Sequence, residues 1–170
     1  MEYKKTITIT LQVKELIYDI QNKAYLTGQA REAEGKSFVA VSNMQASDDE
    51  ENSYQIRRSL SNAFSALKCQ LGEYLAESES KNNNRINGKI DNDAALELTF
   101  KLPNNYNGVS SDSVGDSIHA YLVDAAMSDW FSITNKEDAD IYIAHAAISM
   151  ENVKRALFKR SRPERPTYDV

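Results

Sequence analysis

Apolar and polar residues alternate strictly in two short stretches of the chain. Residues 5–13 read KTITITLQV, and residues 95–102 read ALELTFKL, in which every second residue is apolar until Pro103 interrupts the pattern. A period of two is typical of a strand that buries one face. We therefore expect strands near 5–13 and 95–102. Two strands make too small a sheet to stand alone, so helices must cover it and a neighbouring chain could complete its free edges.

Elsewhere the apolar residues recur at the helical period. A first helix is expected from about residue 13, with Gly28 as an end signal. Residues 28–47 lack a clear period and are expected to form a loop or a frayed extension, in which 37–41 could pair briefly as a strand. Ser47 and Glu50 fit a capping box at the start of a strong amphipathic helix that extends to Leu75.

Two further helices are expected in the second half of the chain. The first, near 112–132, has one apolar stripe, and Met127, Trp130 and Phe131 fall outside it on the far side. We expect these three residues to form an apolar interface patch, because aromatic anchors are common at the centres of interfaces. The last helix begins after Thr134 or Asn135, and its centre, residues 141–150, is apolar on every side, which predicts burial on every side.

These elements predict an α+β fold of about four helices packed on a small sheet. Residues 1–150 are expected to form one domain, because about 170 residues supply a single core. The Asn-rich stretch 78–93 is expected to be a mobile polar loop, and residues 151–170 form a basic helix end followed by an extended tail that contains Pro163 and Pro166.

Charge is distributed unevenly along the chain. The net charge is −5, yet residues 151–170 carry six basic and three acidic side chains, or +3, which leaves −8 for the remainder. Contact between the whole molecule and nucleic acid is therefore disfavoured. No segment approaches the roughly 20 apolar residues that span a bilayer, and the first residues lack the apolar run of a signal peptide. We expect a soluble protein of intracellular origin that makes no membrane contact.

The sequence contains little material for catalysis. It has one cysteine and two histidines, and it lacks the glycine-rich phosphate loops and the nucleophile and zinc motifs of common enzyme classes. His145 lies in the apolar run of the last helix and is expected to be a hydrogen-bonded core residue, while Asp116 is placed to orient His119. We expect no catalytic residues, no cofactor and no metal.

The basic tail allows three interpretations. Helix-dipole stabilisation accounts for Arg155, Lys159 and Arg160 near the helix end, but it does not account for Arg162 and Arg165. Those two lie among prolines that favour an extended backbone, which suits docking onto an acidic neighbour or onto phosphates. The acidic remainder of another copy is itself such a neighbour.

The order of motifs resembles that of a family of small structural proteins from tailed phages of gut Bacteroidales, including crAss-like phages. The motifs are Tyr-x-Thr-Gly at 25–28, Leu-Pro at 102–103, Trp130, and Tyr-x3-Ala followed by Leu-x2-Arg-x-Arg-Pro at 142–163. The resemblance covers nearly the whole chain and implies a head–tail connector or neck-ring subunit that assembles in the host cytoplasm. Its implied partners are copies of itself in a ring of about twelve, portal, neck or tail proteins, and DNA that passes without sequence-specific contact.

Two hypotheses follow from the sequence. In the first, the chain is a virion subunit that associates through Met127, Trp130 and Phe131 and through the basic residues Arg155, Lys159, Arg160, Arg162 and Arg165. In the second, it is a small nucleic-acid-binding or regulatory protein that uses the tail, whose affinity would fall with salt by roughly 0.9 in log–log slope per phosphate.

Overall fold

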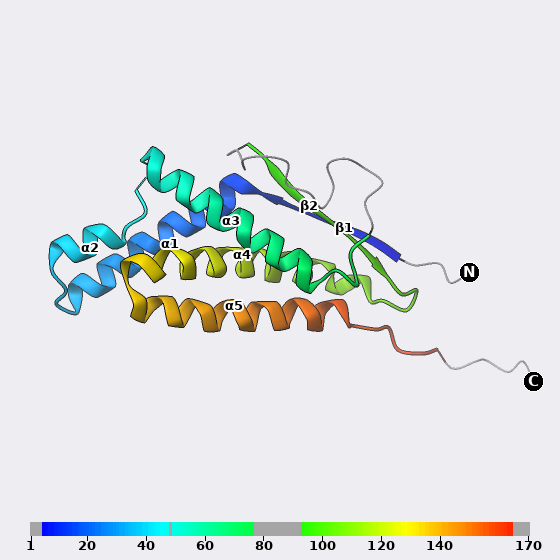
Figure 1. Cartoon of the computed structure of the whole chain (residues 1–170). Helices are drawn as coiled ribbons and strands as arrows, with labels where there is room; N and C mark the ends of the chain where they lie inside the picture. The colour runs from blue at the N-terminus through cyan, green and yellow to red at the C-terminus, as the bar shows by residue number, and fades with distance from the viewer. Residues whose placement is uncertain (1–4, 48, 77–92, 165–170) are drawn as a thin grey trace, which may run out of the picture.

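The computed structural model describes residues 5–47, 49–76 and 93–164. In these residues an α+β fold is confirmed, with five α-helices and a two-stranded sheet (Figure 1). The elements in chain order are β1 (Lys5–Gln12), α1 (Val13–Ala33), α2 (Phe38–Met44), α3 (Glu50–Gln70), β2 (Ala95–Leu102), a 3-10 turn (Gly108–Ser110), α4 (Ser111–Thr134) and α5 (Lys136–Leu157).

The two expected strands pair with each other. β1 and β2 are antiparallel, with Lys5 opposite Leu102 and Gln12 opposite Ala95. The apolar face of β2 is buried, as its alternation predicts. On the far side of β2, Leu75 forms an isolated bridge with Phe100. In the described part of the chain β2 is therefore the inner strand, and β1 is an edge strand.

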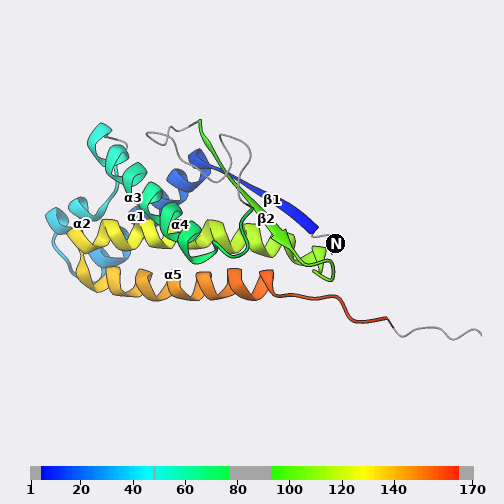
Figure 2. The same ribbon diagram turned by 45° about the vertical axis from the view of Figure 1, so that its right-hand side comes forward.

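α4 is the central helix of the fold. It packs against α5 on one side and against α1, α3 and β1 on the other, and it also contacts α2 (Figures 1 and 2). The helix therefore has packing partners on both sides of its axis. α5 lies on the outside of the helical layers, next to α4.

The first helix is longer than predicted, and residues 28–47 are not a loop. Gly28 is buried inside α1, which continues to Ala33. A β-carbon at Gly28 would lie 3.2 Å from the Cγ of Gln45 and 3.5 Å from Val41, so the glycine makes room for the α2 segment. Ser37 caps α2 by accepting a hydrogen bond from the Ala40 N–H at 3.4 Å, so the strand expected at 37–41 is wrong.

The capping box expected at Ser47 is also wrong. α3 begins at Glu50, and its N-cap residue is Asp49. The Ser47 hydroxyl donates instead to the Asp49 carboxylate at 2.6 Å. The apolar stripe of α3 is buried as expected, at Ile56, Leu60, Ala63, Phe64 and Leu67.

The described part of the C-terminal tail is extended. Lys159 accepts a backbone hydrogen bond from Asn107 at 3.1 Å, and the Ser161 N–H donates to Asn105 at 2.8 Å. Beyond these contacts the tail runs away from the body of the subunit (Figure 2). The polar loop expected at 78–93 lies outside the described residues apart from Asp93.

Candidate assembly surface

The three residues expected to form an interface patch are buried inside the subunit. Met127 and Phe131 are fully buried, and Trp130 is 8% exposed. The prediction of a surface patch on this side of α4 is therefore wrong. These residues belong to the single hydrophobic core of the described chain.

Two neighbouring helices cover this side of α4. The Trp130 indole N–H donates to the backbone oxygen of Met44, at the end of α2, at 2.9 Å. The Phe131 ring stacks on Tyr142 of α5 with centroids 5.5 Å apart. The sequence did not predict α2, so one of the two covering helices could not be anticipated.

The uncovered apolar surface lies instead on α5. The centre of this helix was expected to be buried on every side, and that expectation is wrong. Ile141, Ile143 and Ile148 are 46, 55 and 59% exposed. Ala144 and Ala147, between them, are also exposed. α5 has α4 along its inner side, but within the described residues no element covers its outer side.

The exposed residues form one band, which we call the outer face of α5. Ile141, Ala144 and Ile148 follow the spacing i, i+3 and i+7, so they lie along one side of the helix. Ile143 lies on the other flank of the exposed face, next to Ala147 at i+4. Charged residues flank the band: Asp140 lies at its N-terminal end, and Glu151 pairs with Arg155 at 3.4 Å at the other end. An apolar centre with a charged rim is the usual composition of a protein–protein interface.

A groove between α1 and α5 extends this surface. It has a volume of about 530 Å³ and is lined in part by Leu26, Ile141, Tyr142 and His145. The Tyr142 hydroxyl lies 3.2 Å from the Thr27 hydroxyl and links the two helices across the groove floor.

Arg31 and Asp138 close one end of this groove. The Asp138 carboxylate is buried and accepts hydrogen bonds from Arg31 and from Asn135, the N-cap residue of α5. The pKa of the Arg31 guanidinium is raised, mainly by its hydrogen bond to Asp138 and to a smaller extent by its hydrogen bond to Glu34. Both charges are satisfied internally, so this pair fixes the start of α5 on α1 and leaves no free group for chemistry.

Both histidines differ from expectation. His145 is exposed and lies edge-on to Tyr142, with centroids 5.9 Å apart, so it is not a core residue. The Nε2 atom of His119 lies 2.7 Å from the Asp19 carboxylate of α1, so His119 is oriented by Asp19 and not by Asp116. Across residues 5–47, 49–76 and 93–164, no three His, Cys, Asp or Glu side chains are grouped so that they could hold a metal ion. No helix in the same ranges is long and apolar enough to cross a membrane.

The basic residues expected at the interface are only partly free. Arg155 pairs with Glu151, and the Arg160 guanidinium donates to the backbone oxygens of Leu157 and Lys159 at 2.9 and 3.2 Å. Lys159 and Arg162 are exposed, and Arg165 lies outside the described residues.

The candidate interface residues that the sequence did not reveal are the isoleucines of the outer face of α5. Their signal was the apolar run at 141–150, but that run was assigned to burial. Comparison with known proteins adds no relative: no family model, no curated protein and no solved structure matches this chain. The outer face of α5 is thus identified by its own exposure and composition.

Proposed function

We propose that this chain is a structural subunit of a tailed-phage virion, a head–tail connector or neck-ring protein without catalytic activity. The observation that carries the proposal is the exposed outer face of α5, where Ile141, Ile143 and Ile148 meet solvent. A contiguous apolar band with a charged rim usually marks a surface that another chain covers. Association would remove these side chains from water and supply the hydrophobic driving force for assembly.

The residues between the isoleucines suit helix packing. Ala144 and Ala147 have small side chains, so a neighbouring element can approach the α5 backbone closely. The flanking charges, Asp140 at one end and Glu151 with Arg155 at the other, favour partners with a complementary order of charges.

A ring is the form of assembly that we propose. In a ring, two different patches of one subunit meet on adjacent copies, so each subunit presents surplus surface and extensions. The outer face of α5 is one such patch, and the basic tail is an extension. Other contacts would be made with portal, neck or tail proteins. The −8 charge of residues 1–150 would keep DNA from adhering as it passes through the channel.

The rival function, nucleic-acid binding by the tail, has less support. Arg155 and Arg160 already have partners within the subunit, so among the described tail residues Lys159 and Arg162 are the exposed cations outside any such contact. Phosphate recognition needs several free cations to overcome repulsion by an acidic chain.

The proposal is tested by placing a charge on the outer face of α5. Ile148→Glu should prevent self-association of the purified full-length chain, because the carboxylate would be buried at the interface. Ile133→Glu is the matched control, since Ile133 is an exposed isoleucine (72%, against 59% for Ile148) at the end of α4 and outside the outer face of α5. Sedimentation velocity over a range of concentrations measures association, and electron microscopy detects rings.

Two results would contradict the proposal. The first is a wild-type chain that stays monomeric at every concentration, both alone and with virion neck components. The second is an Ile148→Glu variant that assembles as well as Ile133→Glu. Circular dichroism and thermal unfolding should be unchanged in both variants, because both positions are solvent-exposed.

A further inference from the structure

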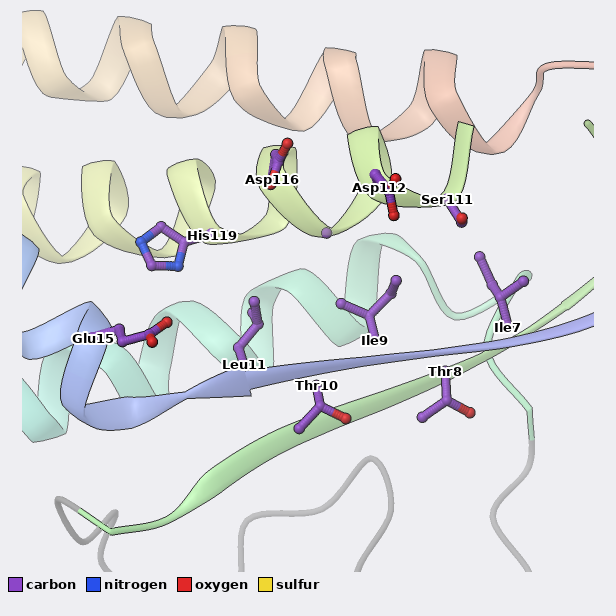
Figure 3. A pocket seen from close by; sticks show the side chains of 11 residues that line it. Ile7, Thr8, Ile9, Thr10, Leu11, Glu15, Ser111, Asp112, Asp116 and His119 are labelled. Carbon is purple, nitrogen blue, oxygen red and sulfur yellow. The ribbon is translucent and has the colours of Figure 1, made fainter. Parts of the chain in front are cut away.

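A second hollow in the surface lies between β1 and the first half of α4 (Figure 3). It has a volume of about 650 Å³ and is lined by residues of β1, by Glu15 of α1 and by Ser111, Asp112, Gly115, Asp116 and His119 of α4. We call it the β1 groove. It lies on a different part of the subunit from the outer face of α5.

The backbone along one side of the β1 groove is unpaired within the described chain. The Val13 N–H donates to the Ala94 oxygen at 3.0 Å, immediately after the last pair of the β1–β2 ladder. Hydrogen-bonded and non-hydrogen-bonded pairs alternate along an antiparallel ladder, so this bond at Val13 means that the odd-numbered residues of β1 form their backbone hydrogen bonds with β2. The N–H and C=O groups of Thr6, Thr8 and Thr10 then face the free edge.

The apolar side of β1 is incompletely covered. Ile7 and Ile9 are half-buried, whereas Phe100 and Leu98, their partners on β2, are fully buried. The side chains of Ile7 and Ile9 point toward α4, while Thr8 points away (Figure 3). A further strand beside β1 would pair its free backbone groups and cover these isoleucines at the same time.

The walls of the β1 groove are acidic. Glu15, Asp112 and Asp116 line it, and none of them forms an ion pair with another described residue. The one histidine in the lining, His119, is paired with Asp19. An extended segment with basic side chains is therefore the electrostatic complement of the β1 groove.

We propose that the β1 groove of one subunit holds the C-terminal tail, residues 162–170, of a second copy of this chain. This inference rests on the proposed function as an assembly subunit. Residues 162–170 would then be the arm that links adjacent copies, and the β1 groove would be the surface that receives it.

The length and sequence of the tail fit this site. The nine residues 162–170 span roughly 30 Å when extended, and the eight residues of β1 span roughly 26 Å. Glu164 and Asp169 offset these two arginines, so residues 162–170 have no net side-chain charge, and the fit depends on which side of the segment each charge occupies. In a polyproline-like path with three residues per turn, Arg162 and Arg165 would lie on one side, about 9 Å apart and facing the acidic wall, while Glu164 would lie on another side. Thr167 and Tyr168 have high strand propensity and keep their backbone donors, so they are suited to pair with β1.

The direction of the tail favours a second copy. Ser161 is held to Asn105 by a backbone hydrogen bond, and residues 162–164 lead away from the body in both views (Figures 1 and 2). A neighbouring subunit on that side would lie in the path of the tail. One tail and one groove per subunit give a head-to-tail contact that repeats around a ring.

A binding measurement tests the occupant and the acidic wall. A fluorescently labelled peptide of residues 162–170 is titrated with the full-length Arg162→Glu/Arg165→Glu chain, in which the substitutions keep the chain's own tail from competing for the groove. Fluorescence anisotropy measures binding. Introducing Asp112→Asn/Asp116→Asn into the same chain should weaken peptide binding by roughly 2- to 30-fold, because two exposed ion pairs are lost. Glu50→Gln/Glu51→Gln removes two first-turn acids of α3 and should leave binding unchanged. Absence of saturable binding would overturn the inference.

A second variant tests the free edge of β1. Thr8→Pro removes an N–H that faces the free edge and leaves the bonds to β2 in place, so it should weaken peptide binding by roughly tenfold. Thr8→Val keeps the N–H and should bind like the parent. If Thr8→Pro disrupts the fold, as judged by circular dichroism, the Asp112 and Asp116 variants still decide the question. Equal binding to folded Thr8→Pro and Thr8→Val would exclude strand pairing.

Association of the whole chain distinguishes a second copy from the subunit's own tail. Arg162→Glu/Arg165→Glu should reduce association, and combining it with Asp112→Lys/Asp116→Lys should restore it by exchanging the charges. If the peptide binds but these variants leave the sedimentation profile unchanged, the tail occupies its own groove and the inference is wrong. Ile148→Glu should leave peptide binding intact, so failure of the α5 surface and failure of the tail contact give different results.

Discussion

α4 and α5 present the same pattern in sequence and opposite outcomes in the fold. Both helices carry apolar residues beyond a single stripe. In α4 the additional residues Met127, Trp130 and Phe131 are enclosed by the subunit's own elements. In α5 the additional residues Ile141, Ile143 and Ile148 meet solvent. Surplus apolar residues on a helix therefore indicate a second packing partner, but they do not indicate whether that partner is in the same chain.

The difference follows from the positions of the two helices. α4 lies between α5 and the group formed by α1, α3 and β1, so each of its sides has a neighbour (Figure 1). α5 lies outside α4, and within the described residues its outer side has no covering element.

Phe131→Ala should have the largest effect on stability. The ring is fully buried and stacks on Tyr142, so its removal leaves a cavity between α4 and α5. We expect the free energy of unfolding in urea to fall by about 3–5 kcal/mol. Ile133→Ala, two residues further along the same helix and exposed, should change it by less than about 0.5 kcal/mol. Similar losses at both positions would contradict the enclosure of α4.

Asp138→Ala should have the next largest effect, because it releases the start of α5 from α1. The variant loses buried charge-assisted hydrogen bonds from Arg31 and Asn135, which predicts a loss of about 1.5–3 kcal/mol in urea unfolding. Glu137→Ala is the control, since that exposed carboxylate lies 3.8 Å from Lys36 and should contribute less than about 1 kcal/mol.

The pH dependence of that loss is also predicted. The pKa of Arg31 is raised above its ordinary value, so the stabilisation is present below that value and is lost only as pH rises through the higher pKa of the folded state. The difference between wild type and Asp138→Ala should therefore be the same at about pH 6 and about pH 9. A marked change over this range would assign the interaction to a different group.

Tyr106→Phe should have a small effect of opposite sign. Tyr106 is fully buried between β2 and the tail, and its hydroxyl has no hydrogen-bond partner among the described residues. Removing an unsatisfied hydroxyl should leave the free energy of unfolding unchanged or raise it by up to about 1 kcal/mol at neutral pH. Urea unfolding at neutral pH measures the change, and a loss above about 1 kcal/mol would reveal a partner for the hydroxyl.

Alkaline pH provides a second test of Tyr106. Burial raises the pKa of its hydroxyl, so the neutral form is favoured in the folded state. This contribution to stability is present below the ordinary tyrosine pKa and is lost as pH rises through the higher folded value. Tyr106→Phe should therefore lose less stability than wild type above about pH 10.

Ile148→Ala should have the smallest effect on the subunit itself. The side chain is exposed, so at concentrations where the wild type is monomeric the free energy of unfolding should change by less than about 0.5 kcal/mol. Its effect should be confined to association, measured by sedimentation at high concentration. A loss comparable to that of Phe131→Ala would mean that α5 buries this side as well.

The sequence predicted the elements better than the sites. Both strands and the buried stripes of α1 and α3 followed from local periodicity. Gly28 was misread as a helix end, because the close approach of Val41 and Gln45 that requires a glycine there is not visible locally. His145 was misread as a core residue for a related reason: its neighbours in sequence are apolar, but the side chain is exposed and lies against Tyr142.

By itself the sequence determined the two strands with their amphipathic faces, the four long helices and the presence of more apolar helix surface than one stripe requires, but not α2. Periodicity is a local property, so these features can be derived from neighbouring residues. The tertiary structure alone decided which surplus is enclosed and which is exposed. Burial depends on elements distant in the chain: α2 and α5 cover Trp130 and Phe131, while no described element covers Ile148.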